Sequence, residues 1–380
     1  MDSGLYKTIT FVCFILIGAL LKTKIKSKAE LNGIKKIILN LALPATIFIA
    51  LLGVEVEWDL LFLPIMALVL NILLFLATPI MLPLLGIARD TSEYRTARLL
   101  IPSLAPGLSC FPFVLEFLGE NALAKVAMAD LGNKVFVLIG LYIVAMNWHY
   151  RHRNVKKRKG SKLVSLLKVL VSEPVNLFIG AALILLALGF TMDTLPVLFG
   201  DILKKLSLIM TPLVLLFIGL GIKFKRKQFF QVFSMLSIRA GLVFILGGLF
   251  VASIGLNSLE TILLLLAFGL SSCSFWPYAH ISTVESLELE DDQKRTFDSD
   301  LALNILALSF PLSTVLILGV LNTGTLFVSP INIFLVGGIL LGIGLIYPVV
   351  SGIAKKTSLQ NVTNSKVKPN IPKPVEAQSS

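Results

Sequence analysis

Two proline-interrupted apolar stretches of this sequence carry the polar side chains that could bind a solute. The first stretch spans residues 99–117, and the second spans residues 269–281. Each proline removes a backbone donor, so neither stretch is expected to form one continuous helix. The ends of the resulting half-helices expose N–H groups that can bind a carboxylate and carbonyl groups that can hold a cation. The candidate substrate-binding residues of the two stretches are Ser109, Cys110, Pro112, Ser272, Ser274 and Pro277.

Three ionisable residues within or beside the apolar runs, Asp130, Asp300 and His280, are candidates for taking up a coupling proton. Ionisable groups at membrane depth are costly and are often functional, and a histidine titrates near neutral pH. Asp130 precedes Lys134 by one helical turn, so the two side chains share a face and could neutralise each other. The structural alternatives are an interface position for Asp300 and an ordinary buried role for His280.

Amide and hydroxyl side chains have two interpretations here. Asn133 and Asn304 are candidates for orienting a substrate, but they could instead bridge neighbouring helices, as Asn71 could. The serines of the interrupted stretches could contact a substrate or could only satisfy the kinked backbone. The sequence leaves these alternatives open.

The elements that must position these residues are apolar runs long enough to cross a bilayer. Of the 380 residues, 56% are hydrophobic and only 15% are charged. Runs of roughly 17–25 apolar residues span about 30 Å of hydrocarbon, so the sequence predicts an all-α, polytopic membrane protein. We expect eleven spans, at residues 5–21, 37–54, 60–85, 99–118, 126–148, 173–190, 202–222, 232–255, 260–282, 299–321 and 331–354.

Basic residues gather in alternate loops between these runs, most densely in the loop 149–172. The positive-inside rule therefore predicts a multi-pass protein of the cell membrane, with the N-terminus outside and with this loop and the C-terminal tail in the cytoplasm. The same rule accounts for the net charge of +12 without nucleic-acid binding. The polar tail, 355–380, is predicted to be disordered. The three cysteines do not have the spacing of a disulfide framework or a metal site, and we expect no cofactor.

The long basic loop divides the chain into two sets of five spans, 1–148 and 173–322, followed by an additional helix at 323–354. Because five is odd, a duplicated unit would enter the membrane in the opposite direction the second time, which predicts an inverted repeat. Similar residues recur about 165–170 positions apart, namely Pro44 with Pro212, Pro112 with Pro277 and Asp130 with Asp300. In the additional helix, Gly338 and Gly342 have the spacing of a helix-packing motif.

Several motifs resemble those of the auxin efflux carrier family, which includes the plant PIN-type carriers and bacterial malate-type permeases. They are Ile-Leu-Asn-Leu-Ala-Leu-Pro44-Ala, Ser172-Glu-Pro174-Val-Asn176, Thr211-Pro212-Leu-Val-Leu-Leu-Phe-Ile-Gly219-Leu and the two interrupted stretches. The resemblance covers about residues 1–321. It implies a scaffold domain of runs 1, 2, 6 and 7 and a transport domain of runs 3–5 and 8–10. It also implies that the interrupted helices cross at mid-membrane and that an elevator-like movement carries an organic anion.

Two positions depart from the family pattern. Ala105 stands where members often have Asn, and Ser272 lies near the place of a second Pro in PIN-type carriers. The plant members' long hydrophilic central loop is also absent. These departures favour a plain permease over an auxin carrier.

The predicted function is secondary or facilitated transport of a small organic anion, with its head group between Pro112 and Pro277. The sequence contains no Walker loop, dinucleotide fingerprint or nucleophile elbow, so we expect neither an ATP-driven pump nor an enzyme. H⁺ or Na⁺ could be the coupling ion, and carriers of this general plan are often homodimers. The alternatives are a sodium-coupled symporter with bile-acid-symporter-like architecture and, in another class, a channel or membrane-embedded sensor.

Overall fold

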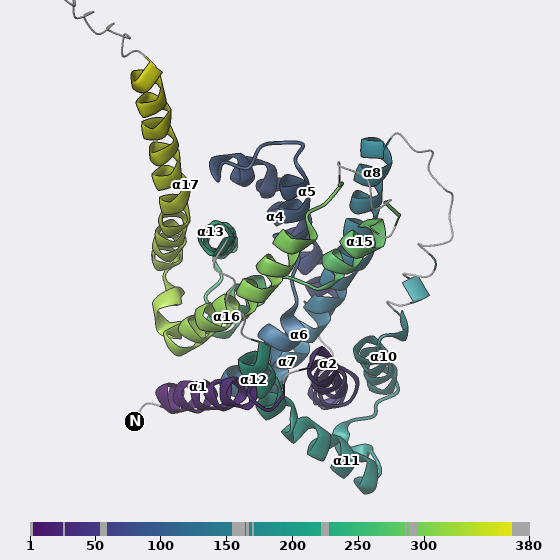
Figure 1. Cartoon of the computed structure of the whole chain (residues 1–380). Helices are drawn as coiled ribbons and strands as arrows, with labels where there is room; N and C mark the ends of the chain where they lie inside the picture. The colour runs from purple at the N-terminus through teal and green to yellow at the C-terminus, as the bar shows by residue number, and fades with distance from the viewer. Residues whose placement is uncertain are drawn as a thin grey trace, which may run out of the picture.

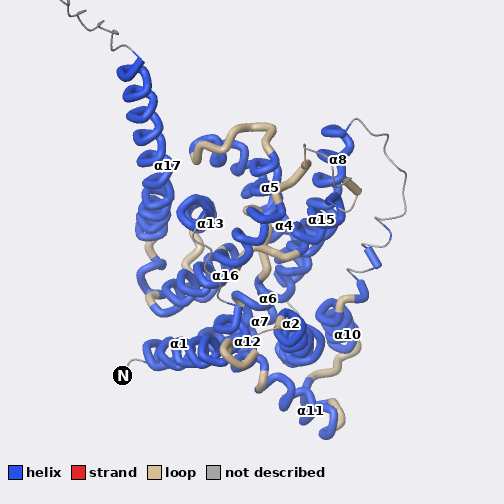
Figure 2. The backbone as a smooth tube through the Cα atoms, in the orientation of Figure 1, coloured by secondary structure: helices blue, strands red, loops and turns tan. Residues whose placement is uncertain are grey.

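The computed structural model describes residues 3–25, 27–53, 59–153, 164, 167–168, 171–221, 228–285, 287–288 and 295–366. These residues form helices joined by short loops, and no strand occurs among them (Figure 2). The α-helices are α1 (Ser3–Leu21), α2 (Lys28–Ile37), α3 (Leu43–Leu52), α4 (Asp59–Leu84), α5 (Ser92–Leu100), α6 (Pro106–Ser109), α7 (Phe111–Val135), α8 (Leu141–Arg153), α10 (Pro174–Ala187), α11 (Val197–Leu208), α12 (Met210–Gly221), α13 (Phe229–Ile254), α14 (Leu259–Gly269), α15 (Trp276–Glu285), α16 (Ser299–Asn322) and α17 (Pro330–Lys366). The π-helical segments η1 (Ile38–Ala42) and η2 (Phe136–Gly140) and the 3-10 helices η3 (Met192–Thr194) and η5 (Gly324–Val328) complete the described elements.

Among the described residues, seven helical segments are long and apolar enough to cross a membrane, and three more are apolar but shorter. The long segments are Ala29–Leu52, Phe62–Leu84, Phe111–Arg151, Val197–Leu220, Phe229–Ile254, Ser299–Asn322 and Pro330–Val350, and the shorter ones are Tyr6–Leu21, Pro174–Ala187 and Leu259–Gly269. These segments fit an integral membrane protein that crosses the bilayer several times. They overlap the apolar runs of the sequence, and the segment Phe111–Arg151 covers the end of the run 99–118 and the whole of the run 126–148.

The helices pack in two groups (Figure 1). In the first helix group, α1 and α2 pack against α12, and α10 and α11 pack against α3. In the second helix group, α4 packs against α7, α13 packs against α14 and α16, and α5 packs against α16. The first group lies in the lower part of Figure 1, and α7 contacts its members α3 and α12. The helix that follows the first interruption therefore lies at the boundary between the two groups.

Both stretches that the sequence predicts to be interrupted leave the α-helix. The chain leaves the α-helix between Leu100 and Pro106, and a second non-helical stretch separates Gly269 from Trp276. A further break lies inside α7 at Gly119, where φ is 87° and ψ is −175°. Only glycine occupies that region of backbone conformation readily. The chain therefore turns at Gly119 and enters the next span without a separate loop.

The C-terminal helix α17 is longer than the predicted additional helix. It continues to Lys366, into the segment 355–380 that the sequence predicts to be disordered. Residues 355–366 contain no proline or glycine that would stop the helix, and the disorder of the tail stays a prediction. Residues 367–380 and most of the basic loop 149–172 lie outside the described residues.

α17 packs along α13 through glycines other than the predicted pair. A Cβ added to Gly344 would lie 3.0 Å from the carbonyl oxygen of Ser234, and Gly337 is similarly close to α13. By contrast, a Cβ on Gly338 or Gly342 would meet no atom within 4 Å. The predicted small-residue pair therefore points into open space, and its neighbours make the close approach.

Gly344→Ala should destabilise the protein by about 1–3 kcal/mol, because the new methyl group overpacks the α13–α17 contact. Gly342→Ala is the matched control and should change stability by less than about 0.5 kcal/mol. Thermal unfolding of the purified variants in detergent measures both effects. Equal losses for the two variants would contradict this packing face.

Candidate functional site

The two helix interruptions hydrogen-bond directly to each other. The backbone N–H of Ala105 donates to the carbonyl oxygen of Ser272 at 2.8 Å. In return, the Ser272 N–H donates to Ser109 Oγ at 2.9 Å, and the Ser274 N–H donates to Ser103 Oγ at 3.0 Å. All four serines are buried. We call this region, residues 101–110 and 270–275, the crossing.

Three serine hydroxyls at the crossing both accept and donate a hydrogen bond. Ser103 and Ser109 each donate their own proton to a carbonyl oxygen of their own interrupted segment, at 2.6 Å and 2.8 Å. Ser309 of α16 behaves in the same way, because it accepts from the Cys273 N–H at 3.2 Å and donates to the Leu306 carbonyl at 3.1 Å. The sequence analysis did not single out Ser309. Its role follows from the packing of α16 against the crossing. In this conformation the hydroxyls of Ser103, Ser109 and Ser309 all bond to backbone N–H and C=O groups.

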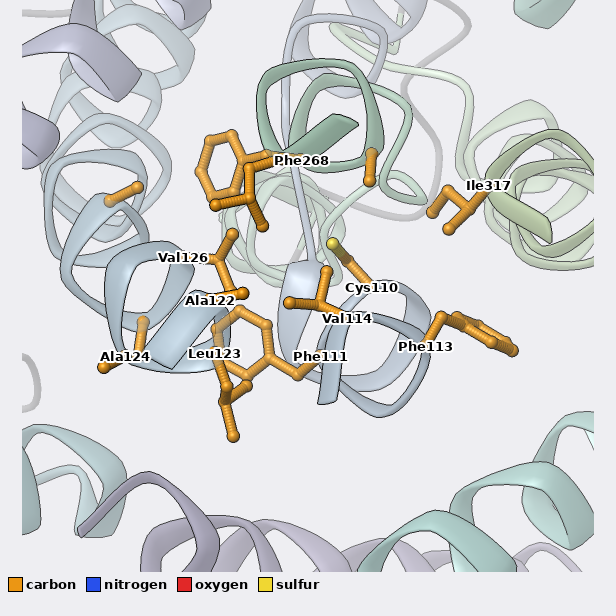
Figure 3. Packing of buried hydrophobic residues seen from close by; sticks show 14 of the residues in the cluster. Cys110, Phe111, Phe113, Val114, Ala122, Leu123, Ala124, Val126, Phe268 and Ile317 are labelled. Atoms are coloured by element: carbon orange, nitrogen blue, oxygen red, sulfur yellow. The ribbon is translucent and has the colours of Figure 1, made fainter. Parts of the chain in front are cut away.

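Apolar side chains seal the crossing. Figure 3 shows Cys110 and Val114 between Phe268 of α14 and Ile317 of α16. Pro112 is the second residue of α7 and is buried. Pro277 occupies the corresponding second position of α15 and is also buried. Exclusion of water strengthens each hydrogen bond of the crossing and makes each unpaired polar group costly.

Asn133 ties α7 to the crossing and to α4. Its side-chain nitrogen donates to the Leu104 carbonyl oxygen at 3.0 Å and to the Asp130 carboxylate at 2.8 Å. Its side-chain oxygen accepts from Asn71 at 2.8 Å. Asn71 and Asn133 therefore bridge neighbouring helices, which is one of the two roles predicted for them. Asn133 also lies at the predicted site.

A buried charge network leads from Asn133 to the first helix group. The Lys134 ammonium lies 3.5 Å from the Asp130 carboxylate, as their one-turn spacing predicts. It also lies 3.3 Å from the Glu173 carboxylate, and it donates to the Asn176 side-chain oxygen at 2.9 Å. Glu173 and Asn176 belong to the start of α10. Lys134 thus connects a helix that supports the crossing to a helix of the other group.

Arg239 of α13 is a second site residue, besides Ser309, that the sequence analysis missed. Its side chain is 3% exposed, and its Nη2 donates to the Ser271 carbonyl at 2.7 Å and to the Ser103 carbonyl at 3.4 Å. One guanidinium therefore contacts both interruptions. Two signals could have found it. Arg239 is the one charged residue in the run 232–255, and it follows Asn71 by the same 168 positions that separate Pro44 from Pro212.

Three predicted site residues lie away from the crossing. Asn304 donates to the Gln228 side-chain oxygen at 2.7 Å, at the start of α13. Asp300 is exposed in the first turn of α16. A helix has about 3.6 residues per turn, and α16 hydrogen-bonds the crossing at Ser309, so both residues precede that contact by more than a turn. His280 is buried, and its Nε2 pairs with the Val137 carbonyl oxygen at 2.8 Å.

An apolar cavity of about 310 Å³ lies between α4, α7, α13 and α14. Leu70, Val126 and Phe268 are among its lining residues, and none of the predicted site residues lines it. Lys125, a cation in the lining, is paired with Glu260 at 3.0 Å. A carboxylate that entered this cavity would lose its hydrating water, and the lining cation is already paired. We therefore do not assign an anionic head group to this cavity.

Comparison of the sequence with protein-family models gives no match, and comparison with curated proteins gives none either.

Ser109→Ala should destabilise the protein by about 1–3 kcal/mol, because it leaves the buried Ser272 N–H without its acceptor. Ser253→Ala is a suitable control, since Ser253 is exposed and bonds only a carbonyl of its own turn. Thermal unfolding compares the two. A Ser109→Ala protein as stable as Ser253→Ala would show that this cross-segment bond contributes nothing.

Lys134→Gln should cost about 3–5 kcal/mol, because it leaves the buried Asp130 carboxylate without its partner. Asp130→Asn should cost less, because the Lys134 ammonium keeps its ion pair with Glu173. The double variant should lose less than the sum of the two single losses, since neither charge then remains. Lys125→Gln at the partly exposed pair with Glu260 serves as a control and should cost no more than about 1 kcal/mol. Additive losses at residues 130 and 134 in a thermal or denaturant titration would argue against a coupled pair.

Proposed function

We propose that this protein is a secondary transporter of a small organic anion that works by alternating access. The observation that carries the proposal is the crossing itself, where two interrupted, buried helical segments from distant parts of the chain bond to each other. Irregular backbone at membrane depth is tolerated where protein buries it or where it lines a solute pathway. Interrupted helices near the middle of two related halves are typical of transporter binding sites.

Reciprocal packing of the two halves supports an inverted five-plus-five repeat. The first helix of the first half, α1, packs against α12 of the second half, and the first helix of the second half, α10, packs against α3 of the first. This exchange is what a two-fold relation between the halves would produce. The resemblance to the auxin efflux carrier family points to the same organisation, with a cell-membrane location and the N-terminus outside. A homodimer through the first helix group belongs to the same proposal.

The two helix groups correspond to the scaffold and transport bodies that the resemblance implies. Movement of the second group would carry both interruptions together, because they are bonded to each other. The contacts of Lys134 with α10 cross the boundary between the groups and would have to break during such a movement. Asp130 is buried beside Lys134, which keeps Asp130 a candidate for coupling to a proton.

Counterflow in liposomes containing the purified full chain tests the proposal. Labelled succinate, benzoate and acetate are the probes, and at least one should exchange saturably against the same unlabelled anion without ATP. Single-channel currents in planar bilayers would instead favour a channel. Strict dependence on a sodium gradient would favour the sodium-coupled alternative. Absence of any carboxylate exchange would remove the organic anion from the proposal.

A further inference from the structure

Arg239 lies at the negative ends of two half-helices at once. Ser103 follows the C-terminus of α5, and Ser271 follows the C-terminus of α14, and the guanidinium donates to the carbonyl oxygens of both residues. The last carbonyls of a helix have no partner within it and carry the negative end of the helix dipole. In transporters with interrupted helices, unwound carbonyls and half-helix C-termini are where a coupling cation binds. Here a side chain of the protein contacts those carbonyls.

The charge of Arg239 is only partly compensated. Its contacts are neutral carbonyl groups, and its Nε has no hydrogen-bond acceptor in the described part of the chain. Within those same residues, no carboxylate forms an ion pair with Arg239, and the Asp130 carboxylate is paired with Lys134. A buried cation without a counter-charge costs several kcal/mol, which a bound anion would repay.

We propose that Arg239 is a built-in cation of the crossing, which takes the place of a coupling cation and supplies the positive charge that binds the substrate anion. This inference rests on the function proposed above and specifies how its site selects a ligand. A guanidinium presents paired N–H groups that match a carboxylate, so the ligand class is carboxylates rather than neutral amides of the same shape. Since the carbonyl ends of both half-helices already face a fixed positive charge, sodium is not needed at this site.

Ligand-induced thermal stabilisation of the purified full chain tests the inference. The anion probes are the potassium salts of succinate, benzoate and acetate, each compared with succinamide, benzamide or acetamide. At least one carboxylate should raise the unfolding temperature of the unmodified protein, and its amide should not. Replacement of choline chloride by sodium chloride should leave the unfolding temperature unchanged. These measurements use only the unmodified protein, so they do not depend on whether any variant folds.

Substitutions of Arg239 separate the effect of its charge from the effect of its hydrogen bonds. Arg239→Gln keeps a donor for the carbonyls but removes the charge, and it should weaken carboxylate binding by on the order of 10- to 100-fold. Arg239→Lys keeps the charge and should retain part of the preference for carboxylate over amide. Arg295→Gln is the matched control, because Arg295 is exposed and pairs with Glu285, and it should bind like the unmodified protein.

The outcomes distinguish this inference from the proposed function. Equal carboxylate binding by Arg239→Gln and the unmodified protein would overturn the role of Arg239 and leave an anion transporter. Saturable stabilisation of the unmodified protein by sodium would overturn the built-in cation and favour a sodium-coupled carrier. If no carboxylate stabilises the unmodified protein, the organic-anion function and the role of Arg239 in it both fail.

Discussion

Backbone N–H and C=O groups that leave a helix in an apolar environment must find partners, because each unsatisfied group costs free energy that the fold has to recover elsewhere. In this protein the two interrupted segments largely satisfy each other. Peptide groups of one segment bond peptide and hydroxyl groups of the other, and the serines pass each hydrogen bond on to a carbonyl of their own segment. This mutual requirement holds residues more than 160 positions apart in contact.

The helices around the crossing contribute what the two segments cannot supply themselves. Asn133 of α7 bonds the Leu104 carbonyl, Ser309 of α16 accepts from the Cys273 N–H, and Arg239 of α13 bonds a carbonyl on each side. These side chains differ in the charges that accompany them. Asn133 belongs to a network that contains both Asp130 and Lys134, whereas Arg239 brings a cation without a carboxylate in the described residues. The side chains that support the crossing therefore differ in their electrostatics.

Sequence reasoning located the interruptions but misplaced part of their surroundings. Asp300 and Asn304 were selected because they follow Asp130 and Asn133 at the spacing of a duplicated unit. An error of a few residues in that spacing is small along the chain. In a helix, however, a shift of one residue moves the expected place of a side chain by about 1.5 Å along the axis and rotates it by about 100°. A shift of one or two residues also changes which face of a helix a residue occupies. In α17, Gly337 and Gly344 therefore make the contact that is predicted for Gly338 and Gly342.

By itself, the sequence determined that the chain is helical and built of apolar, membrane-length segments, and that two of those segments must be interrupted. These are local properties, since the length of an apolar run and the missing N–H of a proline do not depend on distant residues. Only the tertiary structure decided which atoms of the two interruptions meet, that their serines bond backbone, and that Arg239 reaches both. Such partners are chosen by the packing of helices far apart in the chain, and no local pattern encodes which faces will touch.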